Sequence, residues 1–386
     1  MDKFVYERIC AITLNRIFGF EPKIPLQLIQ NLGSASAVFS MPQQDLRRVF
    51  GMFSKYLPLI SKEQIDISEK EDEWLSKSGY RFLCYWEPEY PALLKECEDP
   101  PIGLYVRSSS PLDQVFTDRP AISIVGTRNM TPYGRLWCRN IVDTISQAPS
   151  KPVIISGLAF GVDVTAHEAA LECGIPTIAV LPTGLDDIYP SAHRRIAQRI
   201  ADTPGCALIT DYPPRTGPQK LNFLRRNRII AALGSSTILI ESKIHGGGMM
   251  TAGLANGYGR SVFALPGRID DVCSAGCNQL LWLKQAEPIV SLGSLPKDLG
   301  LGEYSLRRIA DLKEIIRGKF EGNGELQNIL DIAVIIKRNP GICLDEICGA
   351  LGLPYSLVSR CAGLLEVKGI IHMDLMQQCS IIVKNA

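Results

Sequence analysis

The segment "AISIVGTRNMTPYGRLWCRNIVDTISQ", residues 121–147, joins an apolar run to a glycine-containing turn and then to a helical pattern. Six further apolar runs follow it along the chain: "VIISG" (153–157), "TIAVLP" (177–182), "CALITDYP" (206–213), "STILIES" (236–242), "SVFALPG" (261–267) and "EPIVS" (287–291). Near-continuous apolar strands that alternate with helices are typical of a parallel sheet buried on both faces. The sequence therefore predicts an α/β fold with a doubly wound, extended Rossmann-like and mostly parallel sheet.

The flanking segments follow other patterns. The first part is helical and strand-poor, and it contains a helical pair of SAM or helix-hairpin-helix type. We predict a helical domain at 1–76, the sheet domain at 77–291, a linker at 292–324 and a winged-helix domain at 325–386. Contact with DNA, contact with protein and plain packing stay open for the helical domain. The third helix of the winged-helix domain carries only Arg360 and Lys368 as cations, so DNA reading and protein binding both stay open there.

Composition limits the classes of function. The chain has 386 residues, of which 46% are hydrophobic, and a formal net charge of +1, so any anion site must be local. The twelve cysteines show no C-x-x-C spacing and no histidine at ligand spacing. We therefore expect unpaired thiols in a reducing cytosol, no metal and no cofactor. The N-terminal segment has no apolar signal core and no run is long enough to cross a bilayer, which predicts a cytoplasmic protein without a membrane partner.

Four predicted strand ends lead into turns rich in Gly, Ser and Thr that open helices, at 127–134, 158–167, 183–190 and 243–253. In open α/β sheets ligands bind beyond the carboxyl ends of the strands, where such turns present free N–H groups and positive helix ends to anions. The turns match neither G-x-G-x-x-G nor the P-loop pattern. The sequence thus predicts an anion site at this edge and disfavours dinucleotide reduction and nucleoside triphosphate hydrolysis.

Several residues at this edge have both a functional and a structural interpretation. Arg128 follows a strand end without a neighbouring acid, which favours a phosphate contact over a surface ion pair. Ser156 and Gly157 could bring a hydroxyl and an amide to the same phosphate, or could simply form the turn. His167 follows Asp163 by four residues, so both share a helix face, and we expect a structural hydrogen bond between them rather than a catalytic dyad.

The stretch "QKLNFLRRNRIIAALG", residues 219–234, concentrates cations around one aromatic residue at the same edge. Cations beside an exposed ring are the design of a single-strand binder, whereas solvated arginines beside a packing phenylalanine are the structural alternative. We predict a nucleic-acid-facing loop from Lys220 to Arg226, with Phe223 exposed in it, and a sheet-packing helix from Asn227. In this interpretation the side chains of Lys220 and Arg226 face the nucleic-acid strand.

Glu241 ends a predicted strand, and we expect it to anchor Arg228 or Arg226 rather than to act in catalysis, because no nucleophile or metal set accompanies it. His193 and His245 have no partners at catalytic spacing. We interpret both histidines as surface or packing residues.

In order, the motifs "SIVGTRNMTPYG", "ISGLAFGVDVTAHEAAL", "TIAVLPTGLDDIYP", "LITDYPP", "NFLRRNRIIAALG", "VFALPG" and "SAGCNQLL" closely resemble the bacterial DNA-processing protein A (DprA/Smf) family, over roughly residues 80–283. The resemblance implies a binder rather than an enzyme: a protein that binds and protects incoming single-stranded DNA, loads the RecA recombinase during natural transformation, and forms a homodimer through its α/β domain. It implies that the single strand is bound by Thr127, Arg128, Ser156, Gly157, Gly161, Lys220, Phe223, Arg225, Arg226, Asn227, Gly247 and Gly248. Structural support of the site is expected from Asp163, His167, Arg228 and Glu241.

The chain departs from the family pattern at three places. Phe160 stands where the family has an arginine, Leu224 replaces a proline, and Gly246, Gly247 and Gly248 replace Ser-Gly-Ser. These departures leave the path of the phosphates open. The alternative function is a nucleotide-binding phosphoribohydrolase of the lysine-decarboxylase-like class, although no acid follows the glycines as in that class. A transcription factor that uses the winged helix is a third possibility, which the few cations there disfavour.

Overall fold

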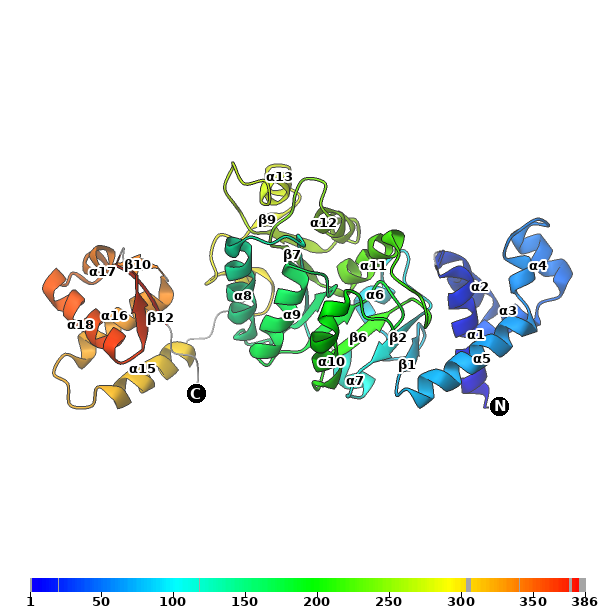
Figure 1. Cartoon of the computed structure of the whole chain (residues 1–386), viewed down its shortest axis with the longest axis horizontal. Helices are drawn as coiled ribbons and strands as arrows, with labels where there is room; N and C mark the ends of the chain where they lie inside the picture. Colours follow the sequence, from blue (N-terminus) through cyan, green and yellow to red (C-terminus); the bar gives the residue numbers. More distant parts are fainter. Residues whose placement is uncertain are drawn as a thin grey trace. The chain divides into compact units, whose positions relative to one another are not determined.

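The computed structural model describes residues 2–19, 21–117, 119–302, 307–339, 341–374 and 377–381. The chain divides into two compact units, Met1–Glu303 and Tyr304–Ala386 (Figure 1). The first unit holds the sheet and all of the predicted site residues, so it is described first.

A nine-stranded sheet forms the centre of the first unit, in the order β1-β2-β6-β5-β4-β3-β7-β8-β9. The strands from β6 to β9 in this order run parallel, while β1 and β2 pair antiparallel at one edge. Strand bounds are β1 Arg81–Cys84, β2 Gly103–Arg107, β3 Ala121–Val125, β4 Val153–Ser156, β5 Thr177–Val180, β6 Ala207–Thr210, β7 Ser236–Leu239, β8 Ser261–Ala264 and β9 Glu287–Pro288. The predicted doubly wound, mostly parallel α/β fold is confirmed.

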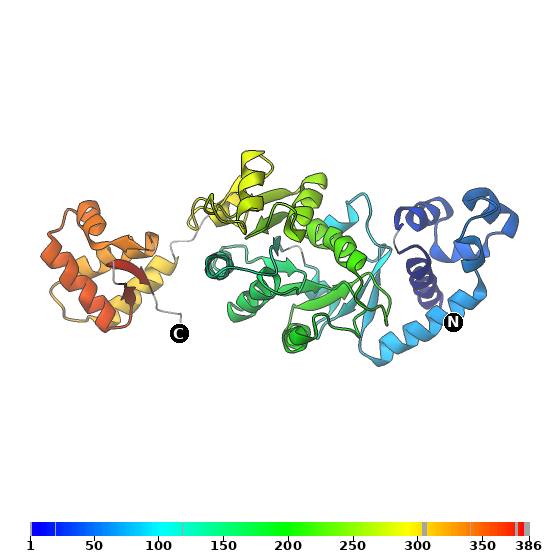
Figure 2. The ribbon, with the colours of Figure 1, turned by 45° about the horizontal axis from the view of Figure 1, so that its top comes forward.

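Helices cover both faces of this sheet (Figures 1 and 2). On one face lie α8 (Pro132–Ser146), α9 (Val162–Glu172), α10 (Arg194–Asp202) and α14 (Leu295–Asp298), and on the other α11 (Lys220–Leu233), α12 (Gly247–Gly257) and α13 (Ala275–Trp282). Alternate strand residues face opposite sides: Ile122 and Ile124 pack towards α8 and α9, whereas Val125 packs towards α11 and α12. Both sides of each central strand are therefore buried, which explains the near-continuous apolar runs in the sequence.

The N-terminal segment folds into α1 (Lys3–Phe18), α2 (Lys23–Leu32), α3 (Ala35–Ser40), α4 (Gln43–Phe50), the 3-10 turn η1 (Leu57–Leu59) and α5 (Lys62–Lys77). Its helices share a hydrophobic core with β1, β2 and α10. The amide of Asn15 donates to the backbone oxygen of Asp211 at 2.9 Å, and the hydroxyl of Tyr105 donates to Glu71 at 2.6 Å. These contacts tie the helical segment to the sheet. The shorter elements of the unit are α6 (Ala92–Lys95), α7 (Leu112–Val115) and η2 (Ser191–His193).

The second unit consists of α15 (Arg307–Lys319), α16 (Leu326–Arg338), β10 (Ile342–Cys343), α17 (Leu344–Leu351), α18 (Tyr355–Val367), β11 (Ile371–Met373) and β12 (Gln378–Ile381). The three strands form an antiparallel sheet around one hydrophobic core. The winged-helix assignment and the domain boundaries stay predictions, although the predicted linker includes α14 and α15. In α18, Arg360 Nε donates to Glu325 at 3.2 Å, so one of its few cations is paired.

Within the described ranges, no single helix is long and apolar enough to cross a bilayer. One bent pair, α17 and α18, meets the criterion of length and composition together, and both of its helices contribute to the core of the second unit.

Candidate nucleic-acid interface

A cavity of about 610 Å³ opens at the carboxyl ends of β3 and β7. Strands β4, β5 and β6 follow β3 on one side, whereas β7, β8 and β9 lie on the other, so this is the point where the strand order reverses. Ligands bind at such switch points because two neighbouring loops diverge there. Eight of the predicted site residues line this switch-point cavity: Thr127, Arg128, Asp163, Phe223, Arg226, Asn227, Gly247 and Gly248.

Arg128 and Phe223 form a stacked pair in the cavity wall. Arg128 is exposed in the loop after β3, and its Cζ atom lies 5.0 Å from the centroid of the Phe223 ring. The ring also meets Tyr189 edge to face, with the two centroids 5.4 Å apart. A guanidinium over an aromatic face is held by the ring quadrupole and keeps its N–H groups free at the edge. The pair therefore presents a positive charge and an aromatic surface at one place.

Helix α11 begins at Lys220, so the predicted start at Asn227 is wrong and Phe223 lies within the helix. The physical reason is that no glycine or proline interrupts the stretch after Pro218, and its Lys, Leu and Arg residues are good helix formers. Lys220 is exposed at the helix start and does not line the cavity, and Arg225 also lies outside its lining. The predicted packing of the helix on the sheet through its apolar residues, Ile229, Ile230 and Leu233, is confirmed.

Arg226 is buried at the back of the cavity instead of being exposed. Its Nη1 atom lies 4.0 Å from Asp163 Oδ2, and its Nε and Nη1 atoms have no hydrogen-bond partner among the described residues. Burial lowers the pKa of Arg226 to about 10, although Asp163 opposes this shift, so the guanidinium stays charged near neutral pH. Burial likewise raises the pKa of Asp163. The cavity thus contains a desolvated cation with unused donors, which favours an anionic occupant.

His167 does not bond to Asp163, so that expectation is wrong. Its Nδ1 atom lies 2.6 Å from Thr177 Oγ1, because the ring points across to β5 rather than along α9 towards the cavity. Burial, followed by the charge of Arg226, lowers the pKa of His167 from 6.5 to about 3. The imidazole is therefore neutral and part of the core, while the carboxylate of Asp163 accepts from the amide of Ala159 at 3.4 Å.

Glu241 anchors neither Arg228 nor Arg226, contrary to prediction. Its carboxylate accepts from the backbone amide of Thr131 at 2.9 Å and from the Thr131 hydroxyl. Thr131 is the N-cap of α8, so Glu241 complements the positive end of that helix across neighbouring strands. Sequence spacing could not reveal this contact, because it joins residues 110 positions apart.

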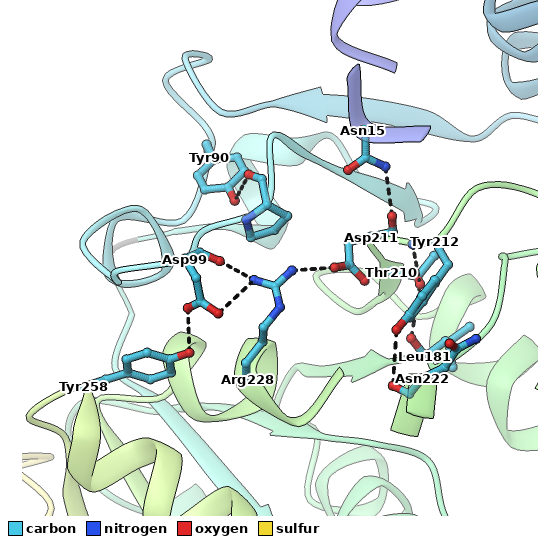
Figure 3. A network of polar contacts seen from close by, with 11 residues as sticks. Asn15, Tyr90, Asp99, Leu181, Thr210, Asp211, Tyr212, Asn222, Arg228 and Tyr258 are labelled. Atoms are coloured by element: carbon cyan, nitrogen blue, oxygen red, sulfur yellow. Dashed lines mark hydrogen bonds and ion pairs between the residues drawn. The ribbon is translucent and has the colours of Figure 1, made fainter. Parts of the chain in front are cut away.

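Arg228 is held by two other carboxylates, as Figure 3 shows. Its Nη2 atom donates to Asp211 Oδ2 at 2.6 Å, and its Nη1 atom lies 3.9 Å from Asp99 Oδ2 and also donates to the Asp99 backbone oxygen. Asp99 in turn accepts from the hydroxyl of Tyr258 at 2.7 Å. The network connects the loop before β2, the end of β6, α11 and the residue that follows α12, so Arg228 supports the fold and does not face the cavity.

Three residues of the predicted binding set lie behind the cavity. The hydroxyl of Ser156 donates to the backbone oxygen of Ile124 at 2.6 Å and so fastens β4 to β3. A Cβ atom at Gly157 would lie 1.2 Å from Arg226 Nη1, so only glycine leaves room for the guanidinium. Gly161 has a φ of +77° and sits against the backbone oxygen of Thr127, a left-handed conformation that glycine adopts freely.

The loop between β7 and α12 contributes the other wall of the cavity. Gly248 approaches Gly126 so closely that an added Cβ would lie 3.2 Å from its Cα, whereas Gly247 faces open space. Sequence reasoning missed Lys243, which lines the cavity, and it interpreted His245 only as a surface or packing residue although that side chain lines the cavity too. Both lie in the turn after the predicted strand 236–242, and this position was the signal that could have identified them. Within the described residues, no group of three or more His, Cys, Asp or Glu side chains is arranged to hold a metal ion.

A family model and the relatives of known sequence indicate the same family for this chain. The family model described as DNA recombination-mediator protein A matches residues 81–299. Protein Smf of Synechocystis sp. is 33% identical over 317 residues, which cover 76% of this chain and 78% of that protein. DNA processing protein DprA of Streptococcus pneumoniae is 36% identical over 213 residues, covering 55% of this chain and 72% of the relative.

Two solved structures are similar to this chain. The X-ray structure of DNA processing protein A from Streptococcus pneumoniae has a TM-score of 0.61 at 29% identity, and the match covers 75% of this chain and 96% of that one. The second structure is that of DNA processing protein A from Helicobacter pylori, which is described for its single-stranded DNA binding mode. It has a TM-score of 0.50 at 33% identity, and the match covers 57% of this chain and 95% of that one. The matched family region contains both loops of the switch-point cavity and the whole of α11. The chain belongs to the DNA recombination-mediator protein A family.

Proposed function

We propose that the chain binds single-stranded DNA at the switch-point cavity. The observation that carries the proposal is the stacked pair of Arg128 and Phe223, which offers a phosphate ligand and a base platform side by side. A base would stack on the ring of Phe223 once Arg128 turns to a phosphate. The Helicobacter pylori relative, described for its single-stranded DNA binding mode, supports the same class of ligand.

The rest of the cavity fits a sugar–phosphate backbone. Gly246 and Gly247 open α12, where helix N–H groups without intrahelical partners and the positive helix end attract anions. Lys243 adds an exposed cation to the same wall, and the buried Arg226 adds a fixed charge at the back. Lys220, at the exposed start of α11, would contact the DNA strand outside the cavity.

A salt titration of oligothymidine binding, followed by fluorescence anisotropy, tests the proposal. On single strands each neutralised phosphate contributes about −0.7 to the slope of log affinity against log salt. We expect Arg128→Ala to lower the affinity and to flatten the slope by about that amount. The proposal fails if wild type does not bind the oligonucleotide, and the phosphate role of Arg128 fails if the variant binds like wild type.

The proposed cellular role is recombination. We infer that the chain protects incoming single strands and loads RecA recombinase onto them during natural transformation, which agrees with the family description as a recombination mediator. We further infer a homodimer through the α/β unit, supported by Trp282 and Val290, which are 79% and 78% exposed. The twelve free cysteines support a reducing, cytoplasmic location. Strand exchange by RecA on protein-coated DNA, with and without the chain, tests the loading step.

We propose no catalytic activity. In the alternative phosphoribohydrolase, a glutamate near the glycine turn would act on a nucleoside monophosphate. Here the carboxylate of Glu241 is occupied by Thr131 and by the N-terminus of α8. An assay of AMP hydrolysis separates the two functions, since AMP turnover without preference for single strands would favour the phosphoribohydrolase.

A further inference from the structure

Two aromatic side chains that the proposed site does not use stand half-exposed beside the switch-point cavity. Phe160 is 48% exposed and meets His193 edge to face, with the ring centroids 4.7 Å apart. Tyr189 is 40% exposed and meets Phe223 in the same way at 5.4 Å. Phe223 lines the cavity and so does Ala159, the neighbour of Phe160. Both exposed rings therefore border the cavity.

The backbone beneath these rings is well fixed. His193 is buried, and its Nδ1 atom lies 2.8 Å from the backbone oxygen of Leu158, which connects η2 to the loop that carries Phe160. The residues on either side of Tyr189, Ile188 and Pro190, are buried as well. Rings held in this way lose little conformational freedom when a ligand stacks on them.

Two arginines follow His193 directly, in the first turn of α10. Arg194 and Arg195 are both exposed, and within the described ranges neither guanidinium lies within 4.0 Å of a carboxylate. Cations at a helix N-terminus are unfavourable because the helix dipole is positive there. An anion bound near α10 would offset this repulsion, so the placement favours a polyanionic ligand.

Phe223 is the less accessible platform in the free protein. Arg128 covers its ring at 5.0 Å, and the side chain is only partly exposed. Tyr189 and Phe160 have no cation stacked on them among the described residues.

Building on the proposed function, we propose that Phe160, Tyr189, Arg194 and Arg195 form a second segment of the single-strand path, called here the 160/189 platform. Bases that continue from Phe223 stack on Tyr189 and Phe160, and the two arginines contact the phosphates of that segment. Aromatic faces interleaved with cations are the recognition mode of single strands, and the platform borders the cavity through the contact of Tyr189 with Phe223. The exposed acids nearest to the platform along the chain are Asp186 and Asp202. Asp186 accepts from the backbone amide of Arg215 at 2.9 Å, and Asp202 accepts from the side-chain amide of Gln198 at 2.9 Å.

The test compares two oligothymidines, of about 6 and about 16 nucleotides, which span most of the range of single-strand sites. The first variant, Phe160→Leu/Tyr189→Leu, retains apolar side chains and removes both rings. The second, Arg194→Gln/Arg195→Gln, removes both charges. Matched controls are Phe4→Leu, an exposed ring on α1, and Arg199→Gln, an exposed arginine further along α10. Unchanged melting temperatures establish that each variant is folded.

We expect the ring variant to bind the longer oligonucleotide roughly tenfold or more weakly and the shorter one within about twofold of wild type. The charge variant should flatten the salt slope for the longer oligonucleotide alone, by about 1.4 for two phosphates. Phe160→Arg should steepen that slope by about 0.7, because it adds a cation. Both controls should bind like wild type.

The outcomes separate this inference from the proposed function. If Arg128→Ala weakens binding while both platform variants bind the two oligonucleotides like wild type, the platform is overturned and the cavity remains. Equal losses of affinity for the shorter and the longer oligonucleotide also overturn the platform, since the rings would then act within the cavity. A platform variant that binds DNA normally but no longer stimulates RecA indicates a protein surface and overturns the inference. If wild type binds neither oligonucleotide, both proposals fail.

Discussion

The guanidinium of Arg128 lies over the ring of Phe223, with 5.0 Å between the Arg128 Cζ atom and the ring centroid. The two residues are far apart in sequence and come from the loop after β3 and from the first turns of α11. Their contact fixes the relative position of these two walls of the switch-point cavity. It also means that a base can use this face of the ring only when the arginine moves to another partner, such as a phosphate.

Phe223→Leu should separate stacking from charge. Removing the ring is expected to weaken oligothymidine binding by about 1–3 kcal/mol while the salt slope stays that of wild type, because no cation is lost. Anisotropy titrations at several salt concentrations measure both quantities. A flattened slope with unchanged low-salt affinity would show that the ring acts only through Arg128.

Gly157→Ala should disturb the buried guanidinium of Arg226. The added Cβ would lie 1.2 Å from Nη1, so the arginine must leave its place next to Asp163. Overpacking of this kind costs about 1–3 kcal/mol of unfolding free energy, which urea denaturation measures. Gly247→Ala is the matched control, because its Cβ meets no atom within 4 Å and should change stability by less than about 0.5 kcal/mol. Equal stability of the two variants would contradict the close contact.

Arg228→Met should destabilise the first unit strongly. The change leaves the buried carboxylate of Asp211 without its cation, and breaking a buried pair costs about 3–5 kcal/mol. The exposed pair of Arg268 and Asp270 provides the comparison, since Arg268→Met should cost less than about 1 kcal/mol. Urea unfolding of both variants measures the difference, and a cost below about 1 kcal/mol for Arg228→Met would refute the role assigned to the network.

The buried His167 should make stability depend on pH. Its pKa is lowered from 6.5 to about 3, so below pH 6.5 the imidazole binds a proton in the unfolded chain but not in the folded protein. Stability from this group is complete above pH 6.5 and is lost on acidification. Between about pH 7.5 and about pH 5.5 the loss is about 1.4 kcal/mol.

A comparison of variants isolates this contribution from other titrating groups. His167→Asn should lose about 1.4 kcal/mol less than wild type over that pH interval, whatever its stability at neutral pH. Identical pH profiles for wild type and His167→Asn would mean that His167 titrates in the folded protein.

The positions that the sequence predicted at one edge of the sheet follow from chain periodicity and strand ends, and their binding roles stay predictions. Thr127, Arg128 and the glycines 246–248 lie in the turns that follow β3 and β7, and parallel strands bring such turns to one edge. The errors concern long side chains. No spacing rule specifies the contacts of Arg226, Arg228 and Glu241, because an arginine or glutamate side chain can reach several neighbouring elements.

The alternation of buried strands and helices and the edge at which the turns gather can be read from the amino-acid sequence, because both follow from local periodicity and from the fixed direction of parallel strands. Which cations are accessible depends instead on contacts between elements that are distant in the chain. Arg128 stands exposed on Phe223, whereas Arg226 is buried beneath Gly157 and Arg228 is tied to Asp211. Arg226 and Arg228 differ because α11 begins at Lys220, so both lie on one helix, and two positions along it turn the side chain by about 200°.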